Sequence, residues 1–155
     1  ISEYAFEDCS SLEDIKLPAG LKRISSHTFN GCTSLKSIQL PAGLEQIGWY
    51  AFADCRSLES LEFLGSVDYI HKYAFRFCSN IKTVTFHNTL EEFENIIDFL
   101  TTDMDFLPTD IRTMRFNKQF ISSKKQLLDY FGNMDSLGRN PRRMSLLEKV
   151  DIEFF

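Results

Sequence analysis

Residues 24–46 read ISSHTFNGCTSLKSIQLPAGLEQ, and residues 47–69 repeat the pattern as IGWYAFADCRSLESLEFLGSVDY. Both stretches have Ile in first place, Phe in sixth, Cys in ninth and Leu in twelfth. Residues 1–23 and 70–92 follow the same pattern, so each cysteine stands 23 residues from the next: Cys9, Cys32, Cys55 and Cys78. Self-similarity at one fixed period predicts a tandem repeat whose units stack as a solenoid.

One unit of this kind is too small to fold by itself. The conformational entropy lost on ordering a unit exceeds the free energy gained from burying its few apolar side chains, so neighbouring units must supply the rest. We therefore expect a single domain over residues 1–155. Within it, residues 1–92 form regular repeats, and residues 93–155 form irregular, helix-containing repeats and a C-terminal cap.

Each unit contains one strand-like stretch. In the pattern Leu-x-x-Ile-x-Leu the last two apolar residues alternate with polar ones, as in a strand with one buried face. We expect four short strands that pair in parallel, at residues 12–17, 35–40, 58–63 and 81–86.

The sequence Leu-Pro-Ala-Gly-Leu follows the strand in the first two units and predicts a turn. Pro18 and Pro41 preset their backbone dihedral and donate no hydrogen bond to a sheet, so each ends a strand. Gly20 and Gly43 permit a positive φ.

Two later stretches have the same strand spacing at longer intervals. Residues 111–116 read IRTMRF and begin 30 residues after Ile81, and residues 147–152 read LEKVDI and begin 36 residues further on. We expect two more strands in the same sheet, with Arg112 beside Glu148.

The longer connections predict helices. Residues 91–103 place Phe93 and three further apolar side chains on one helical face. A second helix is expected after Ser122 or Ser123 as N-cap, with Gln126 completing a capping box and Gly132-Asn133 as its stop.

The 23-residue unit, the Ala-Phe pair, the Cys three places after it and the Leu-x-x-Ile-x-Leu-Pro stretch together resemble the BspA-type leucine-rich repeat. The resemblance covers residues 1 to about 90 and departs from the family pattern after the third and fourth strands, where Gly65 and His87-Asn88 stand in place of Pro. It implies an α/β solenoid, a leucine-rich-repeat superhelix with a parallel sheet of short strands.

The same resemblance implies a function. Proteins of this family are displayed on the surface of bacteria or secreted, and they act in adhesion or protein binding without catalysis. The chain begins at Ile1, in the first place of a unit, so we expect further repeats or a targeting segment before it.

The residues themselves point to no enzyme and no cofactor. The sequence has no glycine-rich phosphate loop, nucleophile elbow or metal-spaced cluster. His27 takes the place that Tyr4, Tyr50 and Tyr73 take in the other units, which predicts a structural role in an aromatic stack. The carboxylate pair Glu59 and Glu62 is expected on an exposed strand face.

The cysteines are expected to be free, buried thiols. Residues in register on stacked units lie about 4.8 Å apart with parallel Cα–Cβ bonds, whereas a disulfide needs Cβ atoms about 3.8 Å apart. Zinc sites use closely paired cysteines, and a 23-residue interval provides none.

Charge excludes one class of partner. The net charge is −5, and no nucleic-acid-binding motif occurs, so nucleic acid is not expected as a partner. No apolar run is long enough to span a membrane. Residues 91–110 hold seven acids and no base, whereas 112–143 hold eight bases. These segments are either solvated helix faces or, for the basic one, a contact for an acidic partner.

The outward side chains of the strands form the predicted binding surface, because solenoids bind partners on extended faces. Oppositely charged side chains on neighbouring strands are expected to pair, so a self-satisfied polar face is the alternative. The predicted binding residues are Glu13, Lys16, Lys36, Gln39, Glu59, Glu62, Lys82, Thr85, Arg112 and Arg115.

Two aromatic residues interrupt the repeat at polar positions. Trp49 takes a place held by Glu3, Ser26 and Lys72 in the other units. Phe77 takes a place held by Asp8, Gly31 and Asp54 in the other units. Each is expected near the surface, either packed against a neighbouring unit or acting as an interface anchor or sugar-stacking platform.

These observations favour a non-enzymatic protein-binding or adhesion module of a surface-exposed or secreted protein. Two other functions remain open at this point. One is a structural spacer that holds other domains apart without a ligand of its own, and the other is a carbohydrate-binding module.

Overall fold

The computed structural model describes residues 1–71, 73–87, 111–135, 147 and 149–155, with the backbone alone for residues 131–135. Its elements are β1 (Arg23–Ile24), β2 (Ser37–Leu40), β3 (Gln46–Ile47), β4 (Ser60–Phe63), β5 (Tyr69–Ile70), β6 (Thr83–Phe86), β7 (Thr113–Phe116), α2 (Lys124–Asp135) and β8 (Asp151–Phe154).

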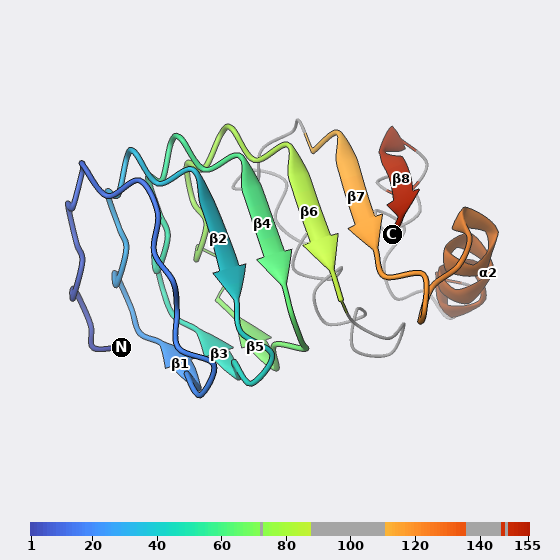
Figure 1. Cartoon of the computed structure of the whole chain (residues 1–155), viewed down its shortest axis with the longest axis horizontal. Helices are drawn as coiled ribbons and strands as arrows, with labels where there is room; N and C mark the ends of the chain where they lie inside the picture. The colour runs from blue at the N-terminus through green and yellow to red at the C-terminus, as the bar shows by residue number, and fades with distance from the viewer. Residues whose placement is uncertain (72, 88–110, 136–146, 148) are drawn as a thin grey trace.

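Five strands form one parallel sheet in chain order, β2-β4-β6-β7-β8 (Figure 1). Ser37 pairs with Ser60, and Ser60 pairs with Thr83, so the regular units lie in the register that the 23-residue period predicts. Thr113 on β7 then pairs with Thr83 on β6. The predicted leucine-rich-repeat solenoid with a parallel sheet of short strands is confirmed.

A second, smaller sheet was not predicted. The two-residue strands β1, β3 and β5 pair in parallel along the lower edge in Figure 1. In each strand an Ile points into the core, and the residue before it is exposed: Arg23, Gln46 and Tyr69. The recurrent Ile at the start of every unit is the sequence signal for this sheet.

The strand predicted at residues 12–17 is not formed. A single backbone bond, from Lys36 N–H to the Glu13 carbonyl at 3.1 Å, joins this stretch to the β2 region. One bond does not make a ladder, and residues 12–17 have no further described neighbour to pair with.

The predicted register of the last strand is wrong by two residues. Met114 pairs with Ile152 and Phe116 pairs with Phe154, so β8 covers Asp151–Phe154. A shift of two keeps each side chain on its predicted face, because strand side chains alternate with period two. Glu148 lies outside the described residues, and Arg112 does not face it in this register.

Helix α2 begins as predicted, but its predicted end is wrong. Ser123 Oγ accepts a hydrogen bond from Gln126 N–H at 3.1 Å, and Gln126 Oε1 accepts one from Ser122 N–H at 2.9 Å. The helix continues through Gly132 to Asp135, because an interior glycine costs about 1 kcal/mol without ending a helix. The predicted helix at residues 91–103 lies outside the described residues.

The turns predicted after residues 12–17 and after β2 are formed, and neither Gly20 nor Gly43 adopts the positive φ that glycine permits. Leu21 N–H donates to the Pro18 carbonyl at 3.0 Å, and Leu44 N–H donates to the Pro41 carbonyl at 3.0 Å. Among the described glycines only Gly31 has a positive φ, at 74°.

The core contains ladders of identical side chains beside ladders of different apolar ones, such as Ile38, Leu61 and Val84. The rings of Phe6, Phe29, Phe52 and Phe75 stack with centroids 5.0–5.1 Å apart. Except in the first unit, these rings are fully buried. Stacked phenylalanines in register bury large apolar areas, so they hold consecutive units at one spacing.

Candidate functional site

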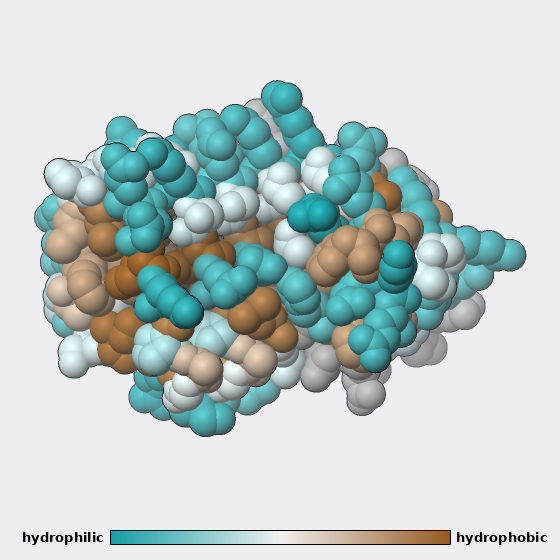
Figure 2. Space-filling model, in the orientation of Figure 1, coloured by the Kyte–Doolittle hydropathy of each residue, from teal (hydrophilic) through white to brown (hydrophobic). Residues whose placement is uncertain are grey.

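The exposed side of the five-stranded sheet, called the strand face below, carries rows of polar side chains (Figure 2). In one row Lys36 Nζ lies 2.5 Å from Glu13 Oε2, and Lys82 Nζ lies 3.4 Å from Glu59 Oε1. The predicted pairing of opposite charges in neighbouring units is thus present twice in this row.

A second row on the strand face is also internally bonded. Gln39 donates to Glu62 Oε2 at 2.9 Å, and Glu62 Oε1 lies 2.7 Å from His87 Nε2. Further along, Arg115 Nε donates to Glu153 Oε2 at 3.1 Å. Most predicted binding residues of this face therefore contact one another.

The pairing is strong enough to move two pKa values. A hydrogen bond to Lys36 and its charge lower the pKa of Glu13, and the same contact raises the pKa of Lys36. Both groups are fully exposed, so water screens their attraction.

One predicted binding residue is not on the surface. Thr85 is only 8% exposed, because its place in β6 lies between β4 and β7 where Glu62 and Arg115 stand beside it. The other predicted residues are exposed or half-buried: Glu13, Lys16, Lys36, Gln39, Glu59, Glu62, Lys82, Arg112 and Arg115. Lys16 and Arg112 take part in none of the ion pairs described above.

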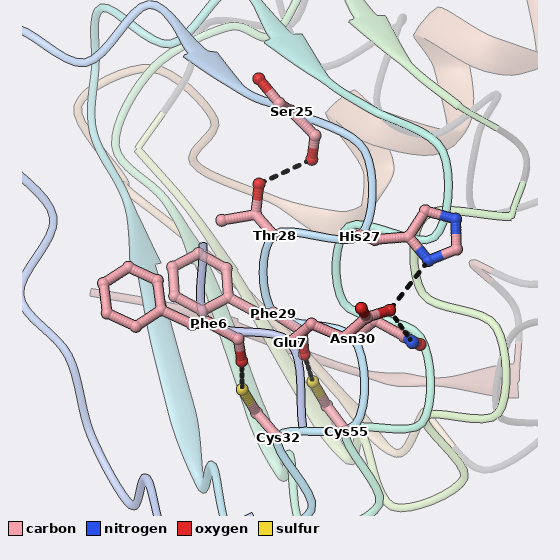
Figure 3. A network of polar contacts seen from close by, with 9 residues as sticks. All are labelled: Phe6, Glu7, Ser25, His27, Thr28, Phe29, Asn30, Cys32 and Cys55. Carbon is pink, nitrogen blue, oxygen red and sulfur yellow. Dashed lines mark hydrogen bonds and ion pairs between the residues drawn. The ribbon is translucent and has the colours of Figure 1, made fainter. Parts of the chain in front are cut away.

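All four cysteines are free, as predicted, and three are buried. The Sγ of Cys32, Cys55 and Cys78 each donates to the carbonyl of the Phe in the preceding unit, at 2.9–3.2 Å (Figure 3 shows the first two). Burial raises the pKa of Cys32 to about 12. The neighbouring Cys78 and burial raise the pKa of Cys55. These thiols are structural donors, whereas Cys9 is exposed, contrary to the predicted burial.

In each regular unit the turn near the small sheet holds one aromatic side chain, and these four rings form a stack, called the aromatic row: Tyr4, His27, Tyr50 and Tyr73. The ring centroids of successive members lie 5.0, 5.2 and 5.6 Å apart. The predicted place of His27 in an aromatic stack is therefore confirmed.

Glu7 joins this row to the next part of the turn (Figure 3). His27 Nδ1 lies 3.4 Å from Glu7 Oε1, and the same oxygen accepts a hydrogen bond from Asn30 Nδ2 at 3.1 Å. Thr28, fully buried behind His27, donates to the Ser25 carbonyl at 2.8 Å.

Three further rings, called the aromatic patch, lie beside this row: Trp49, Tyr69 and His71. The Trp49 and Tyr69 ring centroids lie 5.7 and 6.3 Å from that of His71. Trp49 is 47% exposed and Tyr69 is 56% exposed. Sequence reasoning found Trp49 and missed Tyr69, although Tyr69 stands where other units have Arg23 and Gln46.

Phe77 is 53% exposed, so its predicted place at the surface is also confirmed. The Arg76 guanidinium lies 4.6 Å from the centroid of the Phe77 ring and donates to the Tyr50 hydroxyl at 2.8 Å. Arg76 thus links Phe77 to the aromatic row.

A polar hollow of about 370 Å³ opens on the same turn, across the first three units. Its lining residues are Asp8, Ser10, Asn30, Gly31, Thr33, Asp54 and Arg56. No group of three or more histidine, cysteine, aspartate or glutamate side chains in the described part of the chain is placed to hold a metal ion. Among the same residues, no helix has the length and apolar character that crossing a bilayer requires.

Comparison with known proteins identifies the repeat. No curated protein matches the sequence. A leucine-rich repeat protein from Bacteroides ovatus, known from its crystal structure, is 26% identical with a TM-score of 0.43. The match covers 82% of this chain and 33% of that protein, so the chain spans about a third of its length. The BspA type leucine rich repeat region matches residues 1–127 in six copies. The chain therefore belongs to the BspA-type leucine-rich-repeat family.

Proposed function

We propose that this chain is a non-enzymatic protein-binding module of a surface-exposed or secreted protein, acting in adhesion. Leucine-rich-repeat domains commonly mediate protein interactions, and BspA-type repeats are typical of proteins on the bacterial surface or secreted from it. The partner is a protein on a host or matrix surface.

The observation that carries this proposal is the aromatic patch. Trp49 and Tyr69 belong to the residue types that dominate binding energy at protein interfaces. Their rings are about half exposed, and each lies near the His71 ring. Exposed aromatic rings leave apolar area in water that a partner would bury. The patch crosses two units, so the array presents it on a fixed support.

The strand face is a second candidate surface, and one observation favours part of it. Most charged side chains of the strand face are paired with one another, so they are less available to bind a partner. Among the predicted binding residues, Lys16 and Arg112 are exposed and stand outside those pairs, so their charges are available to a partner.

A capture experiment separates the two surfaces. The 155-residue protein is immobilised as bait against extracellular-matrix and cell-surface proteins, in three altered forms. One carries Trp49→Ala with Tyr69→Ala, one carries Lys16→Glu with Arg112→Glu, and the matched control carries Phe120→Ala. Phe120 is another exposed aromatic residue, 39% exposed, in the segment between β7 and α2.

Each outcome has one meaning. Capture lost only with the aromatic pair supports the aromatic patch, and capture lost only with the charge pair moves the contact to the strand face. No capture by the unaltered protein contradicts the proposal and favours a spacer that holds other domains apart.

A further inference from the structure

We propose that the polar hollow and the neighbouring Phe77 ring form a binding site for a short neutral oligosaccharide. The site lies on the turn at the seventh to tenth places of the units, and Arg76 joins its Phe77 ring to the aromatic row. It does not depend on the protein-binding function proposed above.

The hollow is lined by residues around Gly31. The eighth place of the other regular units holds Asp8, Asp54 and Phe77, and these residues and Gly31 share a positive φ of 56–74°. Asp8 N–H donates to the Asn30 carbonyl at 2.8 Å, and Gly31 N–H donates to the Ala53 carbonyl at 2.9 Å. These bonds hold the eighth places of consecutive units in register. Gly31 has no side chain, and the Asp8 carboxylate packs over it in the space that a Cβ would take.

The lining is polar throughout. Aspartate, asparagine, arginine, serine and threonine side chains surround the space, with no apolar side chain among them. Small-molecule sites range over roughly 300–1,000 Å³ and are mostly apolar, so a hollow of about 370 Å³ with this lining suits a small ligand rich in hydroxyl groups. A saccharide has that chemistry.

The two carboxylates are not equivalent. Asp54 Oδ1 accepts hydrogen bonds from Arg56 Nε and Nη2, at 3.0 and 2.8 Å, so the guanidinium holds it in place. Asp8 leans over Gly31, with its Oδ1 2.2 Å from the position that a Cβ there would take. Asp8 makes no such ion pair with a described residue, so its two oxygens are available to accept bonds from two neighbouring hydroxyls of a sugar.

Donors complete the recognition, and charge selects the class of sugar. Asn30 Nδ2 also donates to Glu7, and Arg56 donates to Asp54, so their remaining N–H groups and the Thr33 hydroxyl are the donors that line the hollow. Two aspartates against one arginine give the lining a net charge of −1 (1 − 2). A sulfated or otherwise anionic sugar is therefore repelled, and a neutral one is not.

Phe77 extends the site by one unit. Phe77 and Asp54 hold the eighth place in consecutive units. Asp54 N–H donates to the Arg76 carbonyl at 2.8 Å, so the two units are in register here. The ring is about half exposed although the Arg76 guanidinium lies 4.6 Å from its centroid, and its exposed part gives an apolar surface for the C–H face of a second sugar ring. The polar hollow and the aromatic ring in the next repeat unit together fit an oligosaccharide better than a single sugar.

The test is a titration of the isotope-labelled protein followed by NMR. The probes are cellotetraose, chitotetraose and mannotetraose as neutral sugars, with a heparin-derived tetrasaccharide as the anionic comparison. We expect at least one neutral tetrasaccharide, at millimolar concentration, to shift the backbone amide signals of Gly31, Thr33 and Asp54. The heparin fragment should leave them in place.

Two variants probe the site, and two serve as matched controls. Asp8→Asn and Phe77→Ala should each weaken binding about tenfold or more, since a hydrogen bond to a charged group and a stacking platform are lost. Asp14→Asn alters another exposed aspartate of the first unit, and Trp49→Ala removes an aromatic residue of the other site. Neither control should change sugar affinity.

Thermal unfolding confirms that each variant is folded before its affinity is compared. The proposal is overturned if no neutral tetrasaccharide shifts these signals, or if Asp8→Asn and Phe77→Ala bind as the unaltered protein does. Equal shifts with the heparin fragment also overturn it. Loss of sugar binding with intact protein capture, or the reverse, shows which of the two proposals has failed.

Discussion

At the scale of single residues, the turns hold side chains in a backbone conformation that few residues adopt. Tyr4, His27 and Tyr50 have φ of 54–60°, a region that costs an L-residue of order 1–2 kcal/mol. The neighbouring unit holds them there: His27 N–H, for example, donates to the Trp49 carbonyl at 2.9 Å. The strain is therefore compatible with the fold only when units are stacked.

The glycines give a matched test of this strain. Gly31→Ala should lower the free energy of unfolding by about 1–2 kcal/mol, because φ is +74° and the new Cβ would overlap the Asp8 carboxylate. Gly20→Ala should be neutral or slightly stabilising, since no atom lies within 4 Å and φ is not positive. Urea denaturation measures both. Equal effects of the two changes would contradict the assignment of strain to Gly31.

The buried thiols give a second prediction at this scale. Below the ordinary pKa of a thiol, Cys32 is protonated in both folded and unfolded chains. Because burial raises its folded-state pKa to about 12, its contribution to stability is lost as the pH rises from about 9 through 12. The fall in stability over that range, followed by urea denaturation, should be smaller in Cys32→Ala than in the unaltered protein. An identical fall in both would refute the linkage.

The accessibility of the thiols is checked separately by labelling. In the native protein near neutral pH only Cys9 should react with a thiol reagent, and all four cysteines should react after unfolding. Reaction of a second thiol without unfolding would show that the buried ladder opens.

At the scale of elements, ladders of like side chains fix the spacing of the units. Phe52 lies between Phe29 and Phe75, with ring centroids 5.1 and 5.0 Å away. Phe6 has one such neighbour and is partly exposed. An inner rung thus contributes more packing than an outer rung, although the two residues are identical in type and place.

This difference predicts two unequal mutations. Phe52→Ala should lower the free energy of unfolding by about 3–5 kcal/mol, as large-to-small changes in a buried core do. Phe6→Ala should cost clearly less, because part of its ring is already in water. The measurement is urea denaturation of each variant, and a cost for Phe6→Ala as large as that for Phe52→Ala would contradict the ladder argument.

At the scale of the whole molecule, the described backbone hydrogen bonds between regular units join consecutive units. The sheet order follows the chain order, and the backbone bonds of the turns join consecutive units. Stability in such an array is close to a sum of unit and interface contributions, so an end unit with one interface opens more often than an inner unit with two.

Hydrogen exchange tests this in the 155-residue protein. Phe6 N–H and Phe29 N–H each donate to a carbonyl of the next unit at 2.8 Å. Despite equal bond lengths, the Phe6 amide should exchange faster, because its unit has a neighbour on one side. Equal protection at the two positions would indicate that the array opens as one cooperative block.

The sequence predicted the regular part of the fold because a repeat transmits its own register. Ser37, Ser60 and Thr83 are spaced 23 residues apart, so each strand pairs in register with the strand of the next unit. The same spacing places the Phe and Cys side chains in ladders. The family pattern, the free thiols and the exposure of Trp49 and Phe77 also came from this periodicity.

The tertiary structure alone decided the features that the repeat period does not determine. The intervals before the strands β7 and β8 are longer, so packing set the register of β8 against Phe116, two residues from the prediction. Exposure of Tyr69, burial of Thr85 and the hollow at Gly31 depend on which side chains meet across units. A repeat places each residue on the coil, but the surface it forms depends on the different residue at the same place in the next unit.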